Sequence, residues 1–196
     1  MRVFQISMLL AVSFSVVTGC SKGASEPEPG ASQGNEAPPV PATGVVAMDK
    51  LSDGQIAEVL MTVDEGEIEQ AQAALQRATD PDVRAFATHM VDQHTASKQA
   101  GTQLASQTGL RPLESPKSRE LRANGAQQLE RLKAADEANF DITYLSGQIE
   151  QHASVLKLIE DQLLPAVNQP GLRDQLQAAR GMVQEHLDRA RQLQKK

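Results

Sequence analysis

Residues 140–163, FDITYLSGQIEQHASVLKLIEDQL, decide the fold of this chain. Their large apolar residues recur mainly at steps of three and four, which is typical of the buried face of an amphipathic helix. These residues are Ile142, Leu145, Ile149, Leu156, Ile159 and Leu163. His152 occupies a position on this face where the pattern predicts an aliphatic side chain. The sequence therefore predicts a long core helix with one histidine among its buried residues.

Three further segments show the same periodicity and predict core helices at about residues 52–79, 81–108 and 170–194. The expected inward-facing residues of the first are Ile56, Leu60, Val63, Ile68, Ala71 and Leu75. Those of the second are Val83, Ala87, Met90, His94, Ser97, Gly101 and Leu104. Those of the segment at residues 170–194 are Leu172, Leu176, Ala179, Val183, His186, Ala190 and Leu193.

The ends of these helices carry typical capping residues. Ser52 and Gln55 form the capping-box pattern S-x-x-Q. Asp80-Pro81 favours a helix start, with Asp as the cap and Pro in the first turn, and Gly109 favours a helix end. The link between the first two core helices is therefore short, which forces an antiparallel hairpin.

A less apolar segment opens at Ser115-Pro116 and predicts a helical crossover with Leu121, Gln128 or Leu129, and Leu132 facing inward. After it, Asp141 is a candidate cap for the third core helix, with Phe140 packing on Leu145; alternatively that helix begins a few residues earlier. Pro165 and the sequence from Asn168 to Gly171 predict its end. We therefore expect an all-α, ferritin-like antiparallel four-helix bundle over residues 48–196, with the crossover between core helices 2 and 3.

Composition narrows the classes of function. The 196 residues are 40% hydrophobic and 3% aromatic, and strictly alternating apolar runs typical of strands are missing. The formal net charge is −6. Such a chain lacks the basic face that nucleic acid requires, and it also lacks a polybasic surface for anionic lipids.

The N-terminal residues 1–19 have the features of a secretory signal peptide: a positive charge at Arg2 and then a short apolar run. The run ends in Val17-Thr18-Gly19-Cys20, which resembles a bacterial lipobox. That resemblance implies cleavage before Cys20 and attachment of acyl chains such as palmitate to it.

Cys20 is the single cysteine, so no intrachain disulfide can form. By analogy with well-studied bacteria, Ser21 after the lipidated cysteine favours the outer membrane. Residues 20–47 are rich in Pro and poor in large apolar residues, which predicts a disordered tether. We expect a protein that is held on the membrane through Cys20, faces the periplasm and is able to meet other envelope proteins.

Three of the four histidines fall on the predicted buried faces: His94, His152 and His186, one on each of three helices. The corresponding position of the first helix holds Glu67. In an antiparallel hairpin, residues equidistant from the turn lie at the same level. Glu67 and His94 are centred on Asp80-Pro81, and His152 and His186 are centred beside Pro170, so we expect these four side chains to meet inside the bundle.

Such a set has two interpretations. Imidazoles and a carboxylate suit a mononuclear site for a divalent transition metal such as zinc, copper, nickel or iron. They equally suit a structural hydrogen-bond cluster. A dinuclear carboxylate site is disfavoured, because Val91, Ile149 and Val183 stand three residues before the histidines where Glu would be needed.

Asp92 and Tyr144 are weaker candidates, as hydrogen-bond partners behind such ligands. His89 is expected to face solvent or the flank of the bundle. No nucleophile–base arrangement and no glycine-rich phosphate loop is present in the sequence, which favours a non-enzymatic role.

The segments VRAFATHMVDQHTAS, FDITYLSGQIEQH and VQEHLDRA resemble the bacterial envelope family catalogued as domain of unknown function 4142. The family pattern includes an acidic residue after Gly on the first helix, here Gly66-Glu67, and M-V-x-x-H on the second, which ends at His94. It continues with F-D-x-x-Y and a following His, and then H-L near the end. The resemblance covers roughly residues 50–194 and implies a ferritin-like fold in outer-membrane or periplasmic proteins, with no established activity. We therefore expect a lipid-anchored envelope protein with a binding or envelope-stress role, or alternatively a metal-binding ferritin-like protein.

Overall fold

A computed structural model describes residues 50–196, and these residues form helices without strands. The all-α prediction is therefore confirmed for this part of the chain. The expected signal peptide, lipidated Cys20 and tether lie outside the described residues. The elements are α1 (Asp53–Arg77), α2 (Pro81–Thr108), α3 (Pro116–Ala134), α4 (Phe140–Leu158), the π-helical turn η1 (Ile159–Leu163), α5 (Leu164–Ala166) and α6 (Pro170–Gln194).

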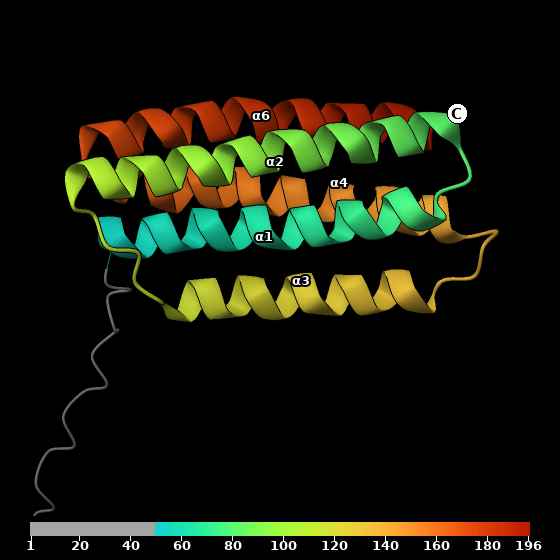
Figure 1. The fold of residues 1–196 in the computed structure, drawn as a ribbon, viewed down its shortest axis with the longest axis horizontal. Helices are drawn as coiled ribbons and strands as arrows, with labels where there is room; N and C mark the ends of the chain where they lie inside the picture. The colour runs from blue at the N-terminus through green and yellow to red at the C-terminus, as the bar shows by residue number, and fades with distance from the viewer. Residues whose placement is uncertain (1–49) are drawn as a thin grey trace, which may run out of the picture. The chain divides into compact units, whose positions relative to one another are not determined.

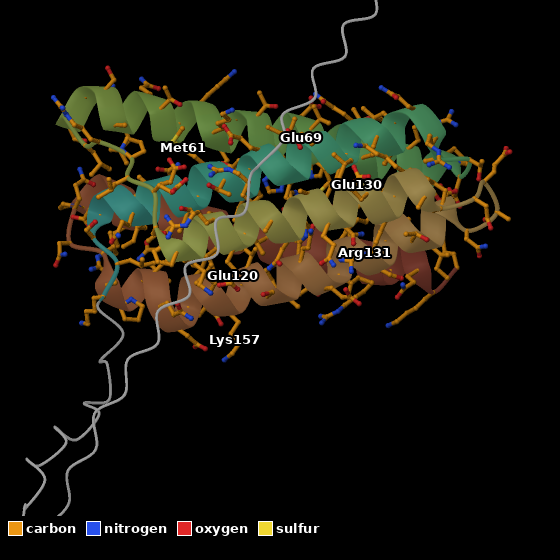
Figure 2. The ribbon with its side chains drawn as sticks, turned by 90° about the horizontal axis from the view of Figure 1, so that it is seen from below. Met61, Glu69, Glu120, Glu130, Arg131 and Lys157 are labelled. Atoms are coloured by element: carbon orange, nitrogen blue, oxygen red, sulfur yellow. The ribbon has the colours of Figure 1, made fainter. Side chains whose placement is uncertain are left out.

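The long helices lie side by side with their axes along one direction (Figure 1). α1 and α2 form one antiparallel hairpin, and α4 and α6 form the other. α3 follows α2 and precedes α4 in the chain, and it runs back along the length of the domain. It packs on α1 and on α4. Because of this return, α4 starts at the same end as α2 and runs parallel to it. Charged side chains such as Glu69, Glu130 and Lys157 cover the exposed surface (Figure 2).

The core consists of two apolar clusters separated by a polar level. One cluster is formed mainly by Ile56, Leu60, Val155, Ile159, Leu163, Leu172, Leu176 and Val183. The other is formed mainly by Ala71, Val83, Phe86, Met90, Leu132, Phe140, Tyr144, Leu145 and Ala190. Between them, along each core helix, lie buried polar residues, including Asp64 and Glu67 on α1 and one histidine on each of the other three helices. An ordinary protein interior is mainly apolar, so this level of buried polar side chains is the unusual part of the core.

Most predicted helix ends are confirmed. Ser52 and Gln55 make the reciprocal capping box, and the Asp80 side chain accepts from the backbone N–H groups of the first turn of α2. Gly109 follows α2 with a φ of 71°, a left-handed conformation that favours glycine. Every predicted inward residue of α6 is buried, from Leu172 to Leu193.

The start of α4 differs from the first of our two expectations. The helix begins at Phe140, its N-cap is Asn139, and no side chain caps it. Asp141 instead accepts hydrogen bonds from the Thr79 backbone and hydroxyl and from the Asp80 backbone N–H, with distances of 2.8–3.2 Å. Asp141 therefore ties α4 to the turn between α1 and α2.

The predicted burial of Ile142 is wrong, because this side chain is 54% exposed. The buried face of α4 instead carries Tyr144 and Gln148 one turn apart, with His152 one turn further on. The face was misplaced because polar side chains occupy it where α4 meets the polar level of the core.

The expected continuous helix through residues 140–163 contains a π-helical turn at Ile159–Leu163, where the Leu164 N–H bonds the Ile159 carbonyl. Pro165 explains the irregularity. It lacks an N–H, and in a regular helix its ring would clash with the carbonyl of Asp161 four residues earlier. The wider turn relieves that clash and lets the chain continue to Ala166. No helix among residues 50–196 has the length and apolar character needed to cross a membrane.

Candidate metal centre

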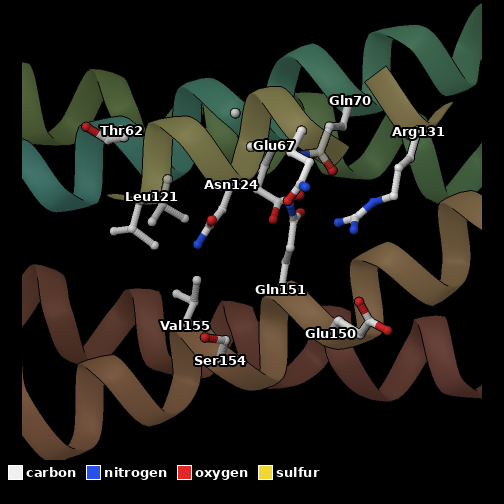
Figure 3. A pocket seen from close by; sticks show the side chains of 14 residues that line it. Thr62, Glu67, Gln70, Leu121, Asn124, Arg131, Glu150, Gln151, Ser154 and Val155 are labelled. Atoms are coloured by element: carbon white, nitrogen blue, oxygen red, sulfur yellow. The ribbon is translucent and has the colours of Figure 1, made fainter. Parts of the chain in front are cut away.

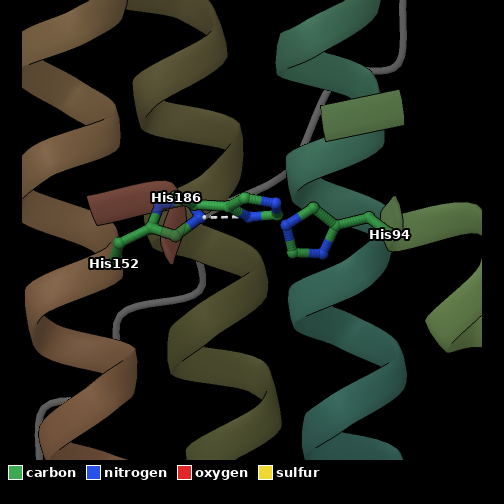
Figure 4. Close-up of side chains that lie close together, drawn as sticks. All are labelled: His94, His152 and His186. Atoms are coloured by element: carbon green, nitrogen blue, oxygen red, sulfur yellow. Dashed lines mark hydrogen bonds between the residues drawn. The ribbon is translucent and has the colours of Figure 1, made fainter. Parts of the chain in front are cut away.

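Three histidines from three helices converge in the polar level of the core: His94 of α2, His152 of α4 and His186 of α6 (Figure 4). Their exposed fractions are 0%, 1% and 0%. Each contributes one ring nitrogen to a group whose members all lie within 4.8 Å of one another. His152 Nε2 and His186 Nδ1 are 3.3 Å apart. Two antiparallel hairpins bring these residues to one level, although 34 or more positions separate neighbouring pairs in the chain.

The other ring nitrogen of each histidine is held by an oxygen atom. His94 Nδ1 lies 2.8 Å from Asp64 Oδ1, and His152 Nδ1 lies 2.9 Å from the backbone carbonyl of Gln148. A carbonyl or carboxylate oxygen accepts hydrogen bonds, so the proton of each of these neutral rings resides on Nδ1. In both rings the Nε2 lone pair is therefore left free.

His186 has the opposite orientation. Its Nε2 lies 2.8 Å from Oε1 of Gln93, and with the Gln93 amide in this orientation the proton is on Nε2 and the free lone pair on Nδ1. Figure 4 draws the 3.3 Å contact between His186 Nδ1 and His152 Nε2 as a hydrogen bond, but with these tautomers neither nitrogen carries a proton and two lone pairs face each other. His94 Nε2 is buried and has no hydrogen-bond partner within the described residues. Figure 4 shows that it is turned toward the other two rings. Three nitrogen lone pairs thus point into one small space.

The environment keeps His152 and His186 neutral. Burial, followed by the nearby histidines His152, His94 and His89, lowers the pKa of His186 to about 2. Burial also lowers the pKa of His152, although the negative charge of Glu67 opposes this shift. Burial raises the pKa of Asp64, and its hydrogen bond to His94 acts in the other direction. Neutral imidazole is the form that binds a metal ion.

Glu67 lies in the same polar level but on the other side of His152. Its Oε1 is 3.8 Å from His152 Nδ1, the nitrogen that faces away from the converging lone pairs. Tyr144 is fully buried nearby. Neither Glu67 Oε2 nor the Tyr144 hydroxyl has a hydrogen-bond partner in residues 50–196. Burial, and to a smaller extent the charge of Glu67, raises the pKa of Tyr144 well above its ordinary value. The histidine trio is therefore formed without Glu67.

Asp92 and His89 do not belong to this group of three residues. Asp92 is exposed on α2. His89 is half-buried on the flank, with its ring centroid 5.6 Å from that of His186.

The residues that hold the rings, Asp64, Gln93 and Gln148, were not predicted from the sequence. For Asp64 a signal was present, since it stands four residues after Leu60 and seven before Ala71, on the buried face of α1. Gln148 holds His152 through its backbone carbonyl, which any residue at that position supplies, and Gln93 carries no comparable signal.

Comparison with known protein families gives a match over residues 37–193, to the family described as Domain of unknown function (DUF4142). Neither the curated proteins nor the solved structures provide a match to the chain. The matched residues include all three histidines and the helices that carry them. The chain belongs to the DUF4142 family.

Proposed function

We propose that this protein binds one divalent transition-metal ion through His94 Nε2, His152 Nε2 and His186 Nδ1. The observation that carries the proposal is the set of hydrogen bonds on the opposite ring nitrogens. Metal-binding histidines usually donate their other N–H to a carboxylate, carbonyl or water, which fixes the tautomer and the ring orientation. Here each ring has such a partner, and each partner leaves the inward nitrogen unprotonated.

The spacing suits a tetrahedral ion. With metal–nitrogen bonds of about 2.0–2.1 Å, two ligands of a tetrahedral site lie about 3.3–3.4 Å apart. His152 Nε2 and His186 Nδ1 are 3.3 Å apart. No pair in the trio exceeds 4.8 Å. His94 Nε2 must therefore move by at most about 1.5 Å to bind the ion, which a rotation of the His94 side chain can provide.

The three nitrogen ligands also restrict which metal ions can bind. Three imidazoles suit zinc, copper, nickel or iron(II), and they do not suit calcium or magnesium, which prefer oxygen. Three protein ligands leave a fourth position for water or a small molecule, as in sites that exchange ligands. The charge of Asp64 behind His94 makes that imidazole a stronger ligand for the metal ion.

One metal-free arrangement competes with this proposal. If the Gln93 amide were turned around, its NH₂ group would donate to His186 Nε2, and His186 Nδ1–H would donate to His152 Nε2. That relay would pair both rings but would still leave His94 Nε2 without a partner. Nitrogen-15 chemical shifts of the metal-free protein distinguish the two, since our proposal requires an unprotonated Nδ1 in His186 and the relay requires a protonated one.

The binding test uses the purified full chain without a histidine tag. We expect one equivalent of zinc, copper, nickel or iron to bind and to raise the melting temperature, and chelation to reverse the shift. Replacing His94, His152 or His186 by Ala removes a ligand and should abolish stoichiometric binding. His89→Ala is the matched control, because it removes a neighbouring imidazole from outside the trio. A chain that binds no metal stoichiometrically and shows no melting shift with any of the four ions would contradict the proposal.

Two further parts of the proposal concern the setting of the site. The parallel course of α2 and α4, with α3 as the return, supports a ferritin-like four-helix bundle in which the metal occupies the core. The sequence Val17-Thr18-Gly19-Cys20 supports a lipid anchor at Cys20 that holds the domain in the bacterial envelope. Cys20→Ala should release the protein from membranes, whereas Ser21→Ala should leave it attached; a membrane-bound Cys20→Ala variant would refute the anchor.

A further inference from the structure

A cavity of about 280 Å³ opens between α1, α3 and α4, beside the polar level of the core (Figure 3). It is separate from the converging histidine nitrogens, none of whose residues lines it. Glu67 forms part of its inner wall and is only 4% exposed. Glu67 therefore presents a buried carboxylate to a space large enough for a small organic molecule.

The polar atoms on this inner wall need hydrogen-bond donors. Glu67 Oε2 and Gln151 Oε1 are both buried and have no hydrogen-bond partner among residues 50–196. Both are acceptors, and no lysine or arginine in the described part of the chain lies within 4 Å of the carboxylate. Leaving buried acceptors unpaired is costly, so the wall favours a ligand that brings N–H groups and positive charge.

The cavity has a different character at its other end. Leu121 and Val155 supply aliphatic surface there, and Figure 3 shows both on the opposite side of the cavity from Arg131. Arg131 is exposed at the rim, donates through Nε to Gln128, and makes no ion pair among residues 50–196. An anion at the rim, a cation at the inner wall and an alkyl chain along the apolar surface would therefore each find a complementary partner.

We propose that this cavity binds a small aliphatic compound through its ammonium group, with Glu67 as the anionic partner. An ammonium group brings three donors, which suits one carboxylate and one amide oxygen. A hard divalent cation fits less well, because it needs six or more oxygen ligands and the wall offers one buried carboxylate. A simple alkylamine and an aliphatic amino acid share this ammonium chemistry, and only the amino acid also supplies a carboxylate for Arg131.

Calorimetric titration of the metal-free full chain tests the proposal with three matched probes. Norleucine carries both charged groups, pentylamine lacks its carboxylate, and hexanoate lacks its ammonium group. We expect saturable binding of pentylamine and norleucine in the roughly millimolar range accessible to such small ligands, and no saturable binding of hexanoate. Tighter binding of norleucine than of pentylamine, lost in Arg131→Gln, would assign the ligand to the amino acids; equal affinity would assign it to the amines.

Glu67→Gln should weaken pentylamine binding by about tenfold or more, because it removes the charge from the hydrogen bond. Glu69→Gln is the matched control: it removes the same charge from the exposed face of the same helix and should change the affinity by less than about twofold. Hexanoate binding as tightly as pentylamine, or no saturable binding of either amine, would overturn the proposal in the unmodified chain, even if Glu67→Gln did not fold. Since the titration contains no metal, its result is independent of the metal proposal.

Discussion

Asp64 offers the sharpest test of how the buried histidines are organised. Its Oδ1 accepts a hydrogen bond of 2.8 Å from His94 Nδ1, and its side chain is 5% exposed. Asp64→Asn keeps an oxygen that can accept this bond but removes the negative charge behind the ring. Asp64→Leu removes both the charge and the acceptor, so that His94 is no longer held in the tautomer with Nε2 free.

Loss of a hydrogen-bond partner behind a metal ligand typically lowers metal affinity 10- to 100-fold, which corresponds to about 1.4–2.7 kcal/mol. We expect Asp64→Asn near the lower limit and Asp64→Leu near the upper one. The stability of the metal-free protein should respond differently to Asp64→Asn. Burial raises the pKa of Asp64, which means that its ionised form is poorly solvated in the fold. A neutral side chain of the same shape should therefore change the free energy of unfolding by less than about 1 kcal/mol.

Competition with a coloured zinc chelator measures the affinity, and urea unfolding of the metal-free protein measures the stability. Glu65→Gln is the control, because it removes a neighbouring charge that pairs with Lys98 on the surface, with 44% of the Glu65 side chain exposed. It should leave zinc affinity unchanged and cost no more than about 0.5 kcal/mol of stability. Equal zinc affinity in Asp64→Leu and the unmodified protein would refute the role assigned to this carboxylate.

Three other outcomes follow from the structure. The pKa values of His152 and His186 are lowered from 6.5, so their neutral forms stabilise the metal-free fold fully above pH 6.5, and this stability is lost as the pH falls below that value. Urea unfolding at pH 5.5 should show a loss of up to about 1.4 kcal/mol for each ring relative to pH 7.5, and an unchanged free energy would contradict this. Gly54→Ala should destabilise the fold by about 1–3 kcal/mol, since its Cβ would lie 2.5 Å from the Arg111 carbonyl oxygen. In Gly181→Ala the added Cβ meets no atom of residues 50–196 within 4 Å, so this change should stabilise α6 by about 0.5–1 kcal/mol. Thermal unfolding of both glycine variants and the unmodified protein measures these two effects.

Local signals in the sequence predicted the helices well where caps and prolines mark their ends. α2 and α6 have the predicted starts at Pro81 and Pro170, because Asp80 and Gln169 accept from the first-turn N–H groups and proline suits those positions. The π-helical turn before Pro165 was missed, since periodicity over one turn does not reveal a wider turn. Ile142 was misplaced because apolar residues alone were used to define the buried face of α4.

The candidate site was predictable only in part. The three histidines could be found because each stands on a buried helical face, and the hairpin geometry set their common height. Two of the residues that hold the rings were harder to predict, because they lie on other helices and their contacts depend on the direction of each side chain. His186 meets Gln93 from another helix, and His94 meets Asp64 across the α1–α2 hairpin. Glu67 has the predicted height, but whether it joins the trio depends on which side of His152 it occupies, and a helix pattern does not specify that.

X-ray absorption at the zinc edge, on the full chain loaded with one equivalent of zinc, reports which atoms surround the bound ion. We expect three imidazole nitrogens at about 2.0–2.1 Å and one oxygen ligand, with the imidazole signal reduced in His94→Ala and unchanged in His89→Ala. A zinc ion surrounded by oxygen, or one whose spectrum is the same in both variants, would contradict it.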